Sequence, residues 1–108
     1  ARTFSGNFNL TVELIKMAIN HKGYALIDIL QPCVTFNKVN TYQWYRDNTY
    51  MLPDNYDPTD RQQAFKIATD TSKLALGVIY KNPNKPIFEE QLAPYKTDKT
   101  PVAYRNLE

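Results

Sequence analysis

The chain contains one cysteine, one histidine and three glycines among its 108 residues. A single cysteine excludes an internal disulfide framework and, taken alone, a metal site built from several cysteines. Three glycines offer no glycine-rich phosphate loop, and one histidine leaves little room for a histidine-based catalytic triad. His21 lies at the end of a predicted helix, and an interaction with the helix dipole is a better interpretation there than a catalytic role.

Long apolar runs and an excess of charge of one sign are also lacking. No stretch approaches the roughly 20 apolar residues that cross a bilayer, and the start has no pattern of a signal peptide. Thirteen basic and eleven acidic side chains give a formal net charge of +2. This small charge predicts neither a nucleic-acid nor a membrane partner. The composition therefore predicts one domain at most, soluble and cytoplasmic.

The first predicted element is a helix over residues 10–21. Its apolar side chains recur at helical spacing, and they are Leu10, Leu14, Ile15, Met17, Ala18 and Ile19. Asn7 or Asn9 can cap the start of this helix. Gly23 suits the position just past its end, where a left-handed backbone favours glycine.

A strand is predicted directly after this helix. Residues 24–30 are apolar apart from Asp28, which is typical of a strand buried on both faces in a parallel sheet. Pro32 ends the strand, because it has no N–H for the ladder. A helix leading into such a strand is one half of a βαβ unit, and we expect the preceding strand to be missing from the chain. The predicted fold class is α/β, with an incomplete sheet.

The middle of the chain, residues 38–56, is rich in aromatic side chains. A short helix is predicted over residues 41–47, followed by an irregular loop. The nearby cations Lys38 and Arg46 are offset by acidic side chains, so packing in a core or an interface explains the rings better than stacking on nucleic-acid bases. The five rings are Tyr42, Trp44, Tyr45, Tyr50 and Tyr56.

A second helix and a second strand are predicted after the aromatic segment. Asp57 is a suitable N-cap, and a proline follows it at the first helical position. This pattern predicts a helix that begins after Asp57 and ends at about residue 71. Its inner stripe comprises Ala64, Phe65, Ile67 and Ala68. Residues 74–80 predict a strand that Gly77 interrupts. Turn and capping chemistry accounts for the neighbouring carboxylates of Asp54, Asp57 and Asp60 better than a metal site does.

The composition changes again at Lys81. Four of the seven prolines follow, at positions 83, 86, 94 and 101, and such a segment does not bury enough surface to fold by itself. We therefore divide the chain into residues 1–80, an α/β segment, and residues 81–108, a disordered tail or an arm that orders along a partner. The candidate anchors of such an arm are Ile87, Phe88, Leu92, Tyr95 and Tyr104.

Cys33 is the residue with the clearest potential for chemistry. It follows the carboxyl end of the predicted strand, where ligands of open α/β sheets gather. A thiolate there can join a metal cluster if three further ligands come from elsewhere. A lone cysteine is more often a small buried residue, and the spacing of residues leaves both interpretations open.

A longer pattern around Cys33 resembles a known family. Residues 21–37 read His-Lys-Gly-Tyr-Ala-Leu-Ile-Asp-Ile-Leu-Gln-Pro-Cys-Val-Thr-Phe-Asn. This run resembles the C-terminal part of the β subunit of 2-oxoacid:ferredoxin oxidoreductases, the subunit that binds thiamine diphosphate. The likeness extends over about residues 3–80 through Phe4-Ser5-Gly6, Tyr42-Gln43-Trp44-Tyr45 and Asp57-Pro58-Thr59-Asp60-Arg61, with Ala64 and Ala68.

The resemblance implies a thiamine-diphosphate-binding fold and a defined reaction. Such enzymes decarboxylate a 2-oxoacid on thiamine diphosphate, pass electrons through a 4Fe–4S cluster to ferredoxin and transfer the acyl group to coenzyme A. By this likeness Cys33 is one 4Fe–4S ligand, and the α subunit and the rest of the β subunit are partners. The family's Gly-Asp-Gly segment, which holds Mg²⁺ and the diphosphate, and its other cluster cysteines have no counterpart here.

We therefore expect the chain to be the C-terminal portion of a longer subunit, inactive alone and without a catalytic residue of its own. The substrate is predicted as a 2-oxoacid, whose identity depends on residues outside the chain. Two alternatives remain on the residues alone. The first is a small stand-alone interaction module in which Cys33 is inert, and the second is a related thiamine enzyme without a cluster.

Overall fold

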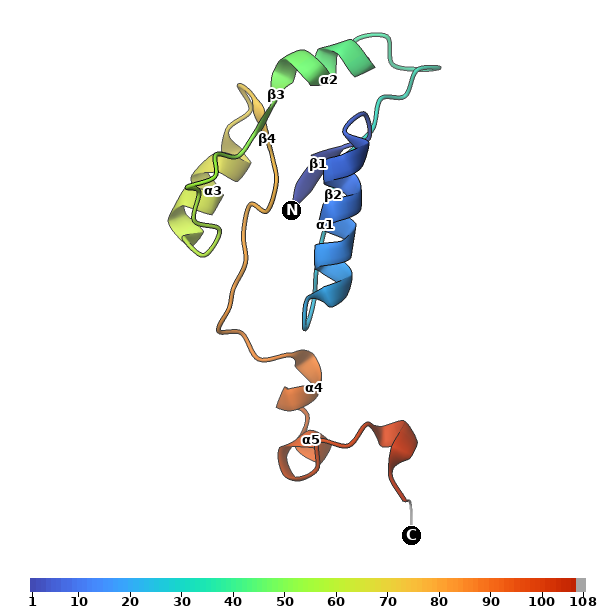
Figure 1. Ribbon diagram of the computed structural model, residues 1–108, viewed down its shortest axis with the longest axis vertical. Coiled ribbons are helices and arrows are strands. Elements are labelled where there is room, and N and C mark those ends of the chain that lie inside the picture. Colours follow the sequence, from blue (N-terminus) through green and yellow to red (C-terminus); the bar gives the residue numbers. More distant parts are fainter. Residues whose placement is uncertain (107–108) are drawn as a thin grey trace.

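The computed structural model describes residues 1–106, and its first half is a βαβ unit (Figure 1). Strand β1 (Arg2–Phe4) leads through helix α1 (Phe8–Asn20) to strand β2 (Asp28–Leu30), and the two strands pair in parallel. The strand expected to be missing is therefore present, and that expectation was wrong. Three residues are too few to produce an alternating pattern, which explains why the sequence does not reveal β1.

The second half contains another βαβ unit. Helix α2 (Tyr42–Asn48) precedes strand β3 (Thr49–Met51), which pairs in parallel with strand β4 (Leu74–Leu76), and helix α3 (Arg61–Thr69) connects the two strands. The position of α2 confirms the short predicted helix. β3 lies where the sequence predicted an irregular loop. Parallel strands with connecting helices confirm the α/β class, and two sheets of two strands each confirm that the sheet is incomplete.

The two units meet at a small core. The backbones of Arg2 and Gly77 exchange two hydrogen bonds, of 2.9 and 2.8 Å, in an antiparallel bridge between β1 and the residue after β4. This bridge brings β4 beside β1. The resulting buried cluster comprises Phe4, Leu10, Leu14 and Leu76.

Local signals place α1 close to its predicted position. The side chain of Asn7 accepts a hydrogen bond from the backbone N–H of Leu10, which makes Asn7 the N-cap. Gly23 has a φ of +107°, as predicted for the glycine past the helix end. Ile15 and Ile19, however, are 38% and 77% exposed and do not belong to the buried stripe.

The prediction of a strand buried on both faces over residues 24–30 is wrong in two respects. Only Asp28–Leu30 is paired, and Leu26 and Ile29 are 64% and 42% exposed. No second layer from the described residues covers this strand. Asp28 forms an ion pair with Arg2, its register partner on β1, at 2.8 Å from Nε to Oδ2. Cross-strand pairing therefore accounts for the one charged residue in the apolar run.

Helix α3 starts three residues later than Asp57 predicts. The N-cap is Asp60, whose side chain accepts from the N–H groups of Gln62 and Gln63. The carboxylate of Asp57 instead accepts from the N–H and hydroxyl of Thr59, and these two hydrogen bonds lower its pKa. The expected inner stripe is also too wide, because Ala64 is buried while Phe65 and Ala68 are exposed.

The predicted strand over residues 74–80 ends early. β4 stops at Leu76 because Gly77 adopts a φ of +131°, outside the β region. After this point the chain leaves the sheets, and the hydroxyl of Tyr56 donates to the carbonyl of Ile79 at 2.6 Å. Burial is the main reason that the pKa of Tyr56 is raised above its ordinary value.

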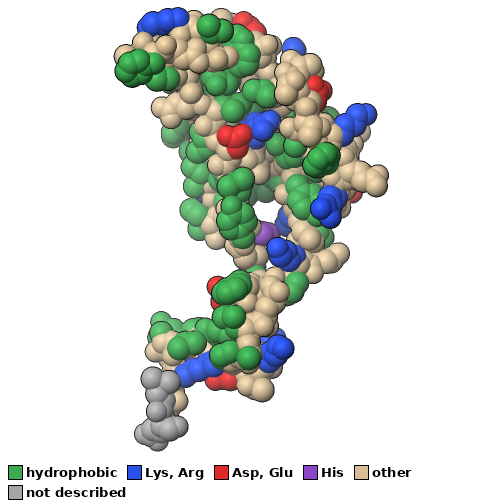
Figure 2. Space-filling view, turned by 180° about the vertical axis from the view of Figure 1, so that it is seen from behind, with side chains coloured by type: hydrophobic (Ala, Val, Ile, Leu, Met, Phe, Trp, Pro, Cys, Tyr) green, Lys and Arg blue, Asp and Glu red, His purple; other side chains and the backbone are tan. Residues whose placement is uncertain are grey.

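The tail contains short helices that extend away from the βαβ units (Figures 1 and 2). They are α4 (Phe88–Gln91), α5 (Ala93–Thr97) and the 3₁₀ turn Val102–Tyr104. The molecule measures 61 × 33 × 21 Å with a radius of gyration of 18.4 Å, against about 13 Å for a compact domain of this length. Residues 107 and 108 of the predicted tail lie outside the described residues.

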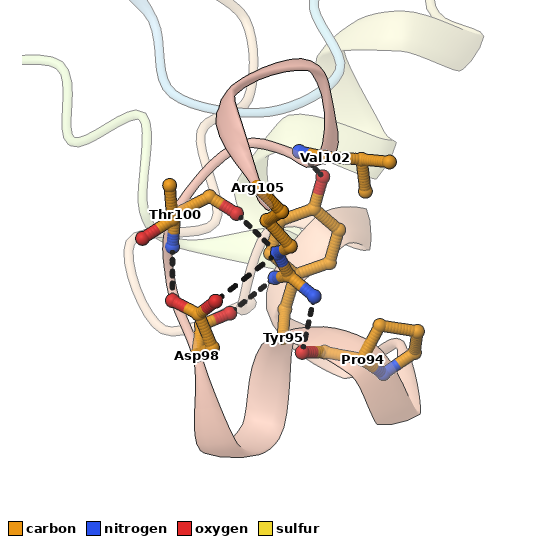
Figure 3. Close-up of polar contacts among 6 residues, drawn as sticks. All are labelled: Pro94, Tyr95, Asp98, Thr100, Val102 and Arg105. Atoms are coloured by element: carbon orange, nitrogen blue, oxygen red, sulfur yellow. Dashed lines mark hydrogen bonds and ion pairs between the residues drawn. The ribbon is translucent and has the colours of Figure 1, made fainter. Parts of the chain in front are cut away.

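Arg105 organises the tail internally (Figure 3). Its guanidinium donates to the carbonyl oxygens of Pro94, Asp98 and Thr100, and its carbon lies 4.6 Å from the ring centroid of Tyr95. The Asp98 carboxylate lies 3.3 Å from Nε. We call residues 88–105 the tail lobe. None of the described helices has the length and apolar character needed to span a membrane.

Candidate functional site

Cys33 lies three residues after the carboxyl end of β2. The buried Pro32 precedes it, and the thiol itself is exposed. The interpretation of Cys33 as a small buried residue is therefore wrong for this structure. An exposed thiol at the carboxyl end of a parallel strand has the position from which α/β proteins contact ligands.

A compact turn holds the backbone around Cys33. The N–H of Asn37 donates to the carbonyl of Cys33 at 2.8 Å. The side-chain oxygen of Asn37 accepts from the N–H groups of Val39 and Asn40, each at 2.9 Å. These bonds fix the loop after β2, so the exposed thiol is presented by a structured turn.

Cys33 can supply one metal ligand and no more. Within residues 1–106, no three His, Cys, Asp or Glu side chains lie together as a metal site requires. The donor is a cysteine sulfur, the type of atom by which proteins hold iron–sulfur clusters. An exposed thiol with no neighbouring ligands suits a cluster whose remaining ligands come from outside these residues. The chemistry of the single donor therefore fits the cluster that the family resemblance implies.

The described residues form a cleft of about 520 Å³ at the carboxyl ends of β1, β3 and β4. One wall of the cleft is formed by the last residues of the three strands, Phe4, Met51 and Leu76. A second wall is formed by the first residues of α1. Arg46 is the one charged residue among those that line it. Cys33 does not line the cleft. Sequence reasoning missed this cleft because β1 and β3, which form part of its wall, escaped prediction.

The aromatic segment contributes to the core beside the cleft. The ring of Tyr45 stacks on Phe4 at a centroid distance of 5.3 Å, and Trp44 meets Tyr45 edge to face at 5.1 Å. Tyr42 also contacts Phe4, with centroids 5.8 Å apart. Packing against the core, one of the two roles predicted for this segment, is confirmed for Tyr45, whereas Tyr42 is 39% exposed.

The remaining candidates have structural roles. His21 is the C-cap residue of α1, and its backbone N–H donates to the carbonyl of Ala18 at 3.2 Å. Asp57 accepts hydrogen bonds from Thr59 in the turn before α3, and Asp60 is the N-cap of α3. Asp54 is exposed in the turn before them. The structure therefore does not bring these side chains and Cys33 into one site.

The two βαβ units, with an exposed cysteine in the turn after β2, define an α/β segment that offers one sulfur donor. The family model that describes the C-terminal region of the pyruvate ferredoxin oxidoreductase β subunit matches residues 33–97, more than half of the chain. The chain belongs to this family. The matched region begins at Cys33 itself, and the first βαβ unit precedes it.

Individual relatives extend the likeness over nearly the whole chain. The β subunit of 2-oxoacid:ferredoxin oxidoreductase 1 from Aeropyrum pernix is 38% identical over 94% of this chain, and a β subunit from a Sulfolobus species is equally similar. The chain covers 37% and 38% of these relatives. It therefore spans little more than a third of the length of the curated proteins it matches.

A solved structure confirms the fold at high similarity. A chain of 2-oxoglutarate:ferredoxin oxidoreductase from Magnetococcus marinus superposes with a TM-score of 0.82 and 33% identity. The match covers 96% of this chain and 36% of that one. That enzyme was solved with 2-oxoglutarate, coenzyme A and succinyl-CoA bound. The short parallel strands seen here thus correspond to part of a larger chain in that enzyme.

Proposed function

We propose that the chain acts as the C-terminal part of the β subunit of a 2-oxoacid:ferredoxin oxidoreductase. The enzyme would oxidatively decarboxylate a 2-oxoacid, form the acyl-CoA and reduce ferredoxin. The observation that carries the proposal is the 38% identity with such a β subunit over 94% of the chain. The α subunit, the remainder of the β subunit and ferredoxin are the proposed protein partners.

Cys33 is the residue of this chain to which we assign a direct role, as one thiolate ligand of a 4Fe–4S cluster. Its exposure on a fixed turn at the end of β2 supports the assignment. When bound, such a cluster supplies one-electron transfer. The role of this chain is to hold one sulfur donor in a fixed place. Thiamine diphosphate and Mg²⁺ would be bound by residues outside the chain.

The two parts of the chain have different proposed roles. Residues 1–80 would extend the parallel sheet of the thiamine-diphosphate-binding domain and place the Cys33 turn. Residues 81–108 would form an arm that contacts a neighbouring subunit. The exposed apolar side chains of the described tail support this role, because Phe88 is 69% and Tyr104 is 80% exposed. By itself the chain is proposed to be inactive.

The test is to replace Cys33 in the assembled enzyme. We expect Cys33→Ala to lower the iron content and to abolish ferredoxin reduction, because a 4Fe–4S cluster normally needs all four protein ligands. Thr35→Ala, an exposed neighbour in the same loop, is the matched control and should retain both properties. Normal iron content and normal ferredoxin reduction in Cys33→Ala would show that the thiol is not a ligand.

A further inference from the structure

Helix α1 carries a second apolar stripe besides the one that faces the core. The second stripe consists of Phe8, Val12, Ile15 and Ile19, which we call the α1 seam. Phe8 and Ile19 are 74% and 77% exposed, although both are large apolar side chains. Figure 2 shows apolar side chains along the edge of the molecule that α1 and β2 form. A helix that is apolar on two faces is typical of one packed between two layers.

The spacing of the α1 seam identifies what kind of element fits it. The intervals between its four residues are four, three and four, which is the heptad repeat of helix-to-helix packing. At 3.6 residues per turn these side chains fall within an arc of roughly 60°. Leu10 and Leu14, which face the core, lie on a different side of the helix. The pattern therefore matches a second helix that lies along α1.

We propose that the α1 seam is the docking site for an amphipathic helix from the part of the β subunit that this chain does not match. The inference rests on the proposed function. The chain covers 37% of its Aeropyrum relative, so the family's subunit has ample further chain to supply a helix. Lys16 flanks the seam, is exposed and forms no ion pair within residues 1–106. An acidic side chain on the docked helix would complement it.

The small size of the seam favours a helix of the same polypeptide over a second copy. A stable interface between separate chains needs roughly 20 to 30 residues a side, and the seam offers four. A helix tethered in the same chain needs far less contact, because the linker already gives it a high effective concentration. Docking of this kind would bury the exposed side chains without any new interface between subunits.

Photo-crosslinking in the assembled enzyme tests the proposal. A photoreactive phenylalanine analogue at Ile15 should crosslink to one peptide of the same β-subunit polypeptide, with apolar residues at heptad spacing. Glu13, exposed on another side of α1, is the matched control position and should not yield this crosslink. Mixing isotopically labelled and unlabelled β subunits before assembly distinguishes crosslinks within one copy from those between copies.

Every other outcome overturns the inference. A crosslink from Ile15 to a second copy or to the α subunit would assign the seam to a different occupant, and no crosslink would leave it solvent-exposed. Ferredoxin reduction by the unmodified enzyme is measured in parallel. Reduction without the expected crosslink would refute the docked helix alone, whereas the crosslink without reduction would refute the proposed function.

Discussion

At the residue scale, the ring of Phe4 connects the parts of the core. It is 3% exposed, stacks on Tyr45 and shares the buried cluster with Leu76 of β4. It also lies against Gly6, where an added Cβ would fall inside van der Waals contact with the ring carbons Cε1 and Cζ. Gly6 is therefore required by the space that Phe4 occupies, and its backbone does not have a positive φ.

We predict that Gly6→Ala destabilises the β subunit by about 1–3 kcal/mol, the usual cost of overpacking. Thermal unfolding of the subunit measures the change. Phe4→Leu removes the ring and is expected to destabilise as well, but the Gly6→Ala cost should be much smaller in that background. Equal costs of Gly6→Ala in the two backgrounds would show that the ring is not the cause.

Local sequence signals predicted several single residues correctly. The Asn7 cap and the positive φ of Gly23 each depend on chemistry within a few residues. The choice between Asp57 and Asp60 as N-cap could not be predicted, because both precede the apolar stripe. Asp57 is engaged by Thr59, and only Asp60 is left to accept from the first N–H groups of α3.

At the element scale, the start of α3 provides a direct test of that choice. We expect Asp60→Ala to destabilise α3 by about 1 kcal/mol, the usual cost of losing an N-cap. Hydrogen exchange of the α3 amides in the β subunit measures it. Asp60→Asn retains a capping oxygen and should behave nearly as wild type. If Asp54→Ala, an exposed neighbour, has as large an effect as Asp60→Ala, the capping role is wrong.

The elements differ in how far the sequence reveals them. Helical periodicity extends over many residues, and α1, α2 and α3 were each predicted within a few residues of their observed bounds. The strands have three residues each, which is too short for a recognisable sequence pattern. Each strand is defined by its pairing with a strand that lies far away in the sequence. The ion pair between Arg2 and Asp28 matches the register of β1 and β2. It could not be used to predict that register, because β1 itself was not predicted.

The contacts of Arg105 are expected to make the tail lobe rigid. Arg105→Ala removes the three hydrogen bonds to carbonyl groups and the contact with Tyr95. We expect chymotrypsin to cleave the tail of the assembled enzyme several times faster, roughly in proportion to the loss of local stability. Lys99→Ala, in the same lobe but exposed, is the control. Equal cleavage rates in the two variants would contradict the role of Arg105.

At the scale of the whole molecule, the chain is extended and its core is small. Besides Pro32, the described residues contain six buried apolar side chains, and one edge of β2 has no partner among the described strands. Open strand edges pair readily with other chains. This architecture agrees with the proposal that the chain acts as one part of a larger β subunit.

We therefore predict that residues 1–108, expressed alone, lack a sharp cooperative unfolding transition. Differential scanning calorimetry measures this property, with the assembled enzyme as the reference. A core of six apolar side chains does not balance the conformational entropy of a chain of this length. A monomer of the segment that melts cooperatively would contradict the prediction.

The candidate site illustrates the same limit at this scale. The position of Cys33 after a predicted strand made it a candidate, but its role as a cluster ligand was predicted only from the family resemblance, because one cysteine carries no spacing pattern. The cleft at the carboxyl ends of β1, β3 and β4 could not be predicted, since it exists only once the two βαβ units are joined. A site whose residues come from distant parts of the chain cannot be predicted from short sequence patterns.

The order of the core residues along the chain has a consequence for synthesis on the ribosome. Phe4, Leu10 and Leu14 are translated before their partner Leu76, which lies in β4. At a synthesis rate of roughly 5–20 residues per second, several seconds pass before Leu76 follows. During this interval the buried cluster lacks Leu76, so the core face of α1 is only partly covered. The nascent chain therefore completes this core only after β4 leaves the exit tunnel.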